Sequence, residues 1–172
     1  MERQALGSLF NVVMGVAPLD LQTARDGDWA KMTHAGHCTI LVIKGQGTDG
    51  DDQTFTLQQA LTAAGGSSKA LAIIDEYMEM EENAANLEAT TAWVRVTQTA
   101  ASTVAPGDPS AQSSALYAIP VDAAELDVAN GFDWIRFNSD GAGAAAQLGA
   151  IIYIFTELRY PNRADRQPSF VS

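Results

Sequence analysis

Apolar and polar positions alternate along much of the chain, in short runs that turn-forming residues separate. Such period-two runs predict strands, because successive side chains of a strand point to opposite faces of a sheet. Each run is rich in β-branched or aromatic residues, as strands are. The clearest lie late in the chain, at residues 116–121, 132–137 and 148–155. Earlier runs predict strands at 37–44, 55–57, 70–80 and 90–98.

This pattern predicts an all-β fold, an antiparallel β-sandwich or jelly roll. About seven strands with turn signals between them suit that class better than βαβ units, which need regular intervening helices. Residues 55–57 either form a short strand or lead directly into a helical turn through 58–64. Asp122 caps a single helical turn, and a tight turn is expected at Asn130 and Gly131, which accept positive φ cheaply. In the strand 37–44 both faces are largely apolar, which predicts an interior strand covered on both sides.

The N-terminal residues carry a different period. Their apolar side chains recur at i, i+3, i+4, i+7 and i+8, which predicts a short helix or arm within residues 1–26. This helix either packs on its own domain or reaches a neighbouring subunit. The sandwich domain then covers 27–161, and 162–172 form an extended tail. The candidate interface residues are Leu6, Leu9, Phe10, Val13, Met14, Tyr160 and Phe170.

Charge restricts the possible partners. The net charge is −11 and the sequence pI is near 4.3, so the surface repels phosphate and nucleic acid is not an expected partner. The longest near-apolar run, 142–155, is shorter than the roughly 18–20 residues of a membrane helix and contains Gln147, so no membrane partner is expected. A single cysteine, Cys38, excludes an internal disulfide.

Two groups of possible metal ligands do not have the required spacing. Asp49, Asp51 and Asp52 resemble the start of a calcium loop, but the twelfth residue is Ala60, which cannot ligate. His37 and Cys38 are adjacent, so they point to opposite faces of a strand, and His34 is separated from them by a turn-like Ala-Gly pair. We therefore expect no metal site.

Catalytic and cofactor signals are equally weak. Glu76, Glu79, Glu81 and Glu82 could do acid–base work if one were desolvated, but a charged edge that deters strand addition explains them better. The glycine- and alanine-rich segment 141–146 matches a dinucleotide fingerprint, but a β-branched run follows where a helix would be needed. No cofactor and no catalytic residue are predicted, so the chain is not expected to be an enzyme.

Residues 124–161, AELDVANGFDWIRFNSDGAGAAAQLGAIIYIFTELRYP, resemble the C-terminal half of a family of tailed-bacteriophage structural virion proteins associated with capsid decoration. Four earlier segments fit the same family, so the resemblance covers roughly 27–161: 27–29, 37–45 with CTILVIKG, 55–60 and 69–71. The departures are Pro120 within a strand, the acidic run 76–82 and the polar tail after Pro161.

The resemblance implies a capsid decoration or cement protein that binds and stabilises the outer surface of a tailed-phage capsid. Its partners would be the major capsid protein and itself, as a dimer or trimer. It would be made in the host cytoplasm and reside on the virion. Two alternatives remain open at this point. One is a component of the tail or of the head–tail junction, and the other is a carbohydrate-binding sandwich that uses Trp29, Trp93 or Trp134.

Overall fold

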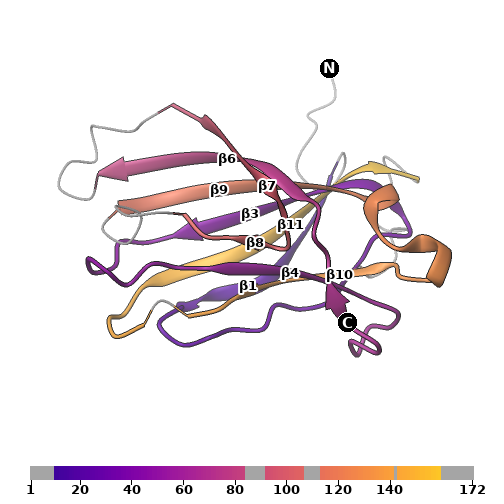
Figure 1. Cartoon of the computed structure of the whole chain (residues 1–172), viewed down its shortest axis with the longest axis horizontal. Coiled ribbons are helices and arrows are strands. Elements are labelled where there is room, and N and C mark those ends of the chain that lie inside the picture. Colours follow the sequence, from indigo (N-terminus) through magenta and orange to yellow (C-terminus); the bar gives the residue numbers. More distant parts are fainter. Residues whose placement is uncertain (1–9, 84–91, 107–112, 142, 160–172) are drawn as a thin grey trace, which may run out of the picture.

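The structure is a computed structural model that describes residues 10–83, 92–106, 113–141 and 143–159. These residues form two antiparallel sheets packed as a β-sandwich, and the long strands run along the long axis of the molecule (Figure 1). The predicted all-β class is thereby confirmed. In the part of the chain that the structure describes, no helix is long and apolar enough to cross a bilayer.

The larger sheet has six strands in the order β1-β11-β3-β9-β6-β7. Its centre is formed by β11, β3 and β9, which pair over eight or more residues each, because all three alternate regularly and carry many β-branched side chains. Their bounds match three of the predicted strands closely. The strands of this sheet are β1 (Asn11–Asp20), β3 (Ala35–Lys44), β6 (Ile74–Asn83), β7 (Val94–Ala101), β9 (Ser113–Asp122) and β11 (Leu148–Leu158).

The smaller sheet has the order β2-β10-β4-β5, and β8 also pairs with β4. Its core is the pair β4–β10, in register from Trp134 opposite Ala60 to Ser139 opposite Phe55. The alternative of a helical turn after residue 57 is therefore wrong, since β4 continues to Ala60. The bounds are β2 (Ala30–Lys31), β4 (Phe55–Ala60), β5 (Lys69–Ala70), β8 (Thr103–Val104) and β10 (Trp134–Ser139).

Two short 3-10 turns join β9 to β10. The first, Ala123–Glu125, follows Asp122, whose backbone N–H donates to the Glu125 carboxylate at 3.0 Å. The second, Val128–Asn130, ends at Gly131 with φ of 84°. Both the capped turn after Asp122 and the tight turn at Gly131 were predicted and are confirmed.

The N-terminal helix is a prediction that the structure corrects for its described part. Residues 11–20 form strand β1, which pairs with the edge of β11, with Val12 opposite Ile154 and Met14 opposite Ile152. Three valines in this segment favour a strand, and β11 would otherwise leave one edge unpaired. Gly15 supports this placement, because a Cβ there would lie 2.6 Å from carbons of the Tyr153 ring. Leu6, Leu9, Tyr160, Phe170 and the tail 162–172 lie outside the described residues.

Aromatic rings fill the space between the sheets. Phe55 of β4 stacks on Phe137 of β10 at 5.7 Å between ring centroids, and Tyr117 of β9 lies 6.2 Å from Phe55. Tyr77 of β6 meets Tyr117 edge-on at 6.3 Å. All four rings are buried, so the two sheets share one continuous core.

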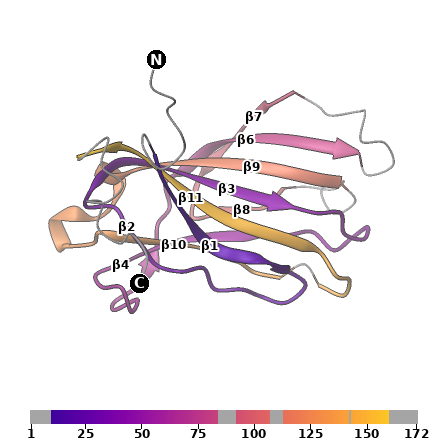
Figure 2. The ribbon, with the colours of Figure 1, turned by 180° about the vertical axis from the view of Figure 1, so that it is seen from behind.

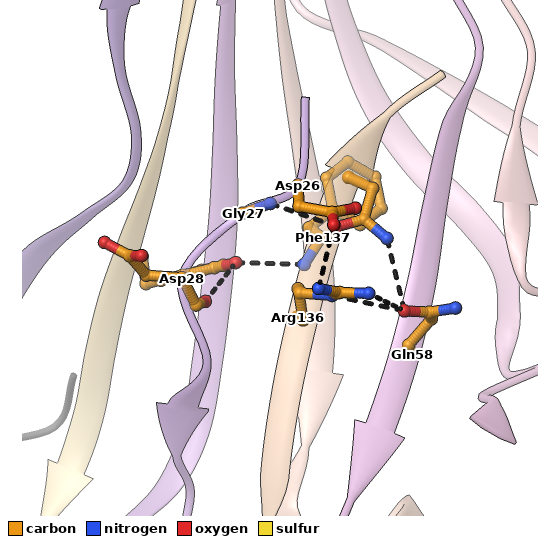
Figure 3. Close-up of polar contacts among 8 residues, drawn as sticks. Asp26, Gly27, Asp28, Gln58, Arg136 and Phe137 are labelled. Atoms are coloured by element: carbon orange, nitrogen blue, oxygen red, sulfur yellow. Dashed lines mark hydrogen bonds and ion pairs between the residues drawn. The ribbon is translucent and has the colours of Figure 1, made fainter. Parts of the chain in front are cut away.

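One hydroxyl connects the two sheets directly. Tyr153, fully buried on β11, accepts a hydrogen bond from the Phe137 backbone N–H at 2.9 Å and donates to the Asp28 carbonyl at 3.2 Å. Next to it, the Gly27 N–H donates to the Asn138 side chain at 3.0 Å (Figure 3). Residues 27 and 28, which precede β2, are thus held beside β10 although they lie outside the β2–β10 pairing.

We predict that Tyr153→Phe lowers the free energy of unfolding by about 1–3 kcal/mol, because the Phe137 N–H loses its partner in a buried place. Tyr117→Phe is the matched control. Its hydroxyl is also buried but has no hydrogen-bond partner among the described residues, so its loss should be neutral or slightly stabilising. Urea unfolding of both variants measures the difference, and equal losses would contradict the role given to the Tyr153 hydroxyl.

Candidate functional site

The outer face of the six-stranded sheet is the candidate site. Figure 2 shows five of its strands, β1, β11, β3, β9 and β6, side by side. Residues directly opposite each other in neighbouring strands share a face, so the register defines three rows of outward side chains. They are Met14–Ile152–Leu41–Ala118–Met78, Ala150–Ile43–Leu116–Met80 and Val12–Ile154–Thr39–Pro120.

These thirteen residues, called the apolar face below, include one threonine and no charge. Met14 is 55% exposed, Ile43 39% and Val12 38%. Most of the others are half-buried by their neighbours within the sheet. The prediction that β3 is covered on both sides is therefore only half confirmed, because no described segment covers this side.

Pairs of polar or charged side chains border the apolar face. At one end, His37 Nδ1 lies 2.7 Å from Asp122 Oδ1, in the row that follows Thr39 and Pro120. At the β6–β7 side, the Arg95 guanidinium contacts the Glu76 carboxylate. An apolar centre with a polar rim is the usual anatomy of a protein–protein contact.

The apolar face includes one of the predicted interface residues. Met14 lies on it, whereas Val13 points the other way and packs against the core. Phe10, half-buried, precedes β1. The sequence indicated that the second apolar face of β3 needs a cover, but the other twelve residues of the apolar face were not among the predicted interface residues.

An apolar groove extends the apolar face at one end. It has a volume of about 490 Å³. Leu148, 67% exposed, stands beside it. Its lining includes Pro18, Leu19, Ile43, Leu148 and Ala150, so two members of the apolar face also form its wall.

The inner face of the same sheet contains a cluster of charges at its end. Lys44 is 1% exposed, and its Nζ donates to the Ser113 carbonyl at 2.6 Å. Burial lowers the pKa of Lys44 to about 8, against the opposing influence of Glu81, Asp52 and Glu79. Lys44 and Glu81 both lie opposite Ala115 of β9, so they share this inner face. We call Lys44, Glu79, Glu81 and Asp52 the inner charge cluster.

Glu79 is the most perturbed acid of this cluster. Burial, and then the neighbouring Glu81 carboxylate, raise the pKa of Glu79 to about 7. The sequence also predicted a charged strand edge here. That prediction is wrong for Glu76 and Glu79, because strand β7 pairs with this part of β6. Strand β9 pairs with Met78–Asn83 from the other side.

The two loop motifs from the sequence dock against each other. Asp51 accepts backbone hydrogen bonds from Ala144 and Ala145, at 3.2 and 2.8 Å. Asp20 accepts from the Gln147 and Gln22 backbone N–H groups at 2.9 Å each, and these bonds lower the pKa of Asp20. Strand β11, not a helix, follows this loop. The acidic and glycine-rich segments therefore brace each other, which accounts for both without a ligand.

The histidine and cysteine residues are not brought together as a site. Cys38 is fully buried on the inner face, and burial raises the pKa of its thiol. His37 faces outward at the rim. Within the described ranges, no group of three or more histidine, cysteine or acidic side chains is arranged to hold a metal ion.

The outer face of the five-stranded sheet is polar, in contrast to the apolar face. Arg136 of β10 donates from Nε and Nη2 to the Gln58 side chain, and its Nη1 lies 3.4 Å from Asp26 (Figure 3). The guanidinium carbon lies 4.7 Å from the ring centroid of Trp29, which is only 7% exposed. Trp134 is half-buried with Lys31 above its ring, whereas Trp93 is 44% exposed. Of the three tryptophans, Trp93 is the one with a freely accessible ring.

Comparison with known proteins gave few matches. No protein-family model and no curated protein matched the chain. Among solved structures, the SPBc2 prophage-derived protein YomS is 9% identical with a TM-score of 0.41, over 84% of this chain and 92% of that one. A chain in the structure of infectious bursal disease virus Gt strain is 7% identical with a TM-score of 0.26, over 95% of this chain and 45% of that one. The infectious bursal disease virus VP2 subviral particle is 10% identical, also at 0.26, over 94% and 44%. These values are too low to establish a shared fold or function.

The inner charge cluster gives a pH prediction. Because the folded pKa of Glu79 lies above the ordinary value of 4.5, the folded chain keeps a proton that the unfolded chain releases. The free energy of unfolding should therefore fall as pH rises from 4.5 to about 7. Lys44 acts in the opposite sense, but at pH above about 8.

Glu79→Gln should flatten this fall, whereas Asp75→Asn, an exposed position on the same strand, should retain it. Urea unfolding across the pH window measures both variants. A wild-type slope in the Glu79 variant would show that another group binds the proton.

Proposed function

We propose that this protein is a structural component of a tailed-phage virion that binds the outer surface of the capsid and stabilises it. Its partners would be the major capsid protein and further copies of itself, and it would perform no catalysis. The sequence resemblance over residues 27–161 suggests the virion role. The apolar face is the observation that supports a protein working through contact.

Contact of the apolar face with water is energetically unfavourable. Soluble monomers rarely expose contiguous apolar patches larger than a few hundred square ångströms, and larger ones usually mark contact sites. Here the patch spans five strands of a protein with 21 acidic residues, and no acid lies within it. A protein that works alone in water has no evident use for such a face.

The mechanism would be thermodynamic. A protein that binds the assembled shell better than its separate parts shifts the equilibrium toward the shell. Many copies on one particle add their effects, and a protein that contacts two shell subunits gains further from the high effective concentration of the second site. The acidic surface would keep such a protein soluble and away from packaged DNA.

Particles lacking the protein should release their DNA at a lower temperature than complete particles, and adding back the purified protein should restore the difference. Heating with a DNA-binding dye measures the release. Equal release temperatures would contradict a stabilising role, and failure to find the chain in purified particles by mass spectrometry would contradict the virion assignment.

Position on the particle separates the alternative within the virion. Gold-labelled antibody should decorate the head in electron micrographs. Labelling confined to the tail or the neck would support a tail or head–tail junction component.

The exposed ring of Trp93 favours carbohydrate binding as a second candidate, because sugars stack on accessible aromatic rings. Trp29 and Trp134 lie beneath cations and are less available for this role. Glycan-array binding that Trp93→Ala abolishes would support this candidate over the first.

A further inference from the structure

The occupant of the apolar face can be argued from charge. The chain carries a net charge of −11, and all thirteen positions of the face are uncharged. The polar groups beside it have partners within the chain, since His37 contacts Asp122 and Arg95 contacts Glu76. A basic partner would therefore gain no charge complementarity from this face. A second copy of the same acidic chain, however, can approach at low electrostatic cost only through such an uncharged surface.

The size of the face suits a weak, concentration-dependent contact. Thirteen positions, about 4.8 Å apart across strands and about 6.8 Å apart along them, cover roughly 420 Å² per copy. Two copies in contact would bury about 850 Å² from these positions, near the lower limit of about 1,000 Å² for a specific interface. The adjoining groove with Leu148 and Leu19 would add to this area.

The side chains suit contact between identical faces. A two-fold axis uses the same surface on both subunits, so the surface must complement itself, and a charge-free sheet face does so without opposing like charges. Leu41 lies at the middle of the central row, with methionines Met14 and Met78 at its two ends. Methionine side chains adapt to irregular gaps, which favours packing at the margins of such a contact.

We infer that the apolar face is a self-association surface, on which a second copy of this chain docks sheet to sheet to form a two-fold dimer. The inference rests on the proposed function in treating this face as a protein–protein contact, and it names the partner. Contact with capsid protein would then fall to other parts of the surface, such as the polar outer face of the five-stranded sheet.

Sedimentation velocity on the purified full-length chain tests the inference. The wild type should show a concentration-dependent shift from the chain mass of 18.2 kDa to twice that mass. Met14→Glu and Ile43→Glu each place a carboxylate in the contact, at positions exposed enough to tolerate it in the monomer. Each should weaken the dimer by about tenfold or more, because the carboxylate would lose water without gaining a partner.

Val128→Glu is the matched control, since Val128 is 60% exposed and lies in the second 3-10 turn, away from the apolar face. It should leave the dimer unchanged. Unfolding at dilute concentration, where monomers prevail, should be similar for all variants.

Three results would overturn the inference. They are a wild type that stays monomeric, equal loss of association in the Val128 variant, and face variants that are destabilised as dilute monomers, which would mean that the chain covers this face itself. Because the experiment contains no particles, a monomeric result leaves the proposed binding to capsid protein untouched and removes only the second copy as a partner in solution. If the chain forms dimers in solution but mass spectrometry does not find it in purified particles, the proposed function is refuted and the inference stands.

Discussion

The Tyr153 hydroxyl fixes the relation between the two sheets. It reaches from the middle of β11 to the backbone of β10, and the same oxygen holds the segment before β2 through Asp28. A hydroxyl in an apolar core is costly unless both of its bonds are made, so the layers have one favourable offset. Within the larger sheet, the strict alternation of β3, β9 and β11 assigns each side chain to one face. The inner charge cluster therefore faces the other sheet, and the apolar face is turned away from it.

Much of the fold follows from local sequence, but not the placement of β1. The central strands are visible because period-two alternation coincides with β-branched residues and clear turns at both ends. The N-terminal residues satisfy a helical period as well, since Phe10, Val13 and Met14 are spaced like one face of a helix. Two tertiary features select the strand over the helix for residues 11–20. They are the edge of β11, which β1 pairs with, and the close approach of Gly15 to the Tyr153 ring. The two-residue strands β2, β5 and β8 likewise exist only through their partners.

The candidate site was predictable in kind but not in position. Apolar residues at both odd and even positions of β3 announced a second apolar face, but the sequence could not say that it would remain exposed. Alternation also places Lys44 with Cys38, Ile40 and Val42 on the inner face, although its charge argues for the outside. The long side chain resolves this conflict, since it reaches backbone carbonyls at the end of the sandwich. The shorter side chain of Glu79 stays half-buried beside Glu81, and its pKa is raised instead.

The two outer faces of the sandwich differ so strongly that they suit different partners. One is apolar and uncharged; the other presents Arg136 and Lys31, each beside an acid and near an aromatic ring. If two copies join through the first, the two polar faces come to lie on opposite sides of the dimer. Such a dimer would offer the same polar surface twice, in directions set by the two-fold axis. A particle built from repeated subunits could engage both at once, and the second contact would then cost little further entropy. Self-association would in this way let two weak contacts, one from each copy, link two subunits of the particle.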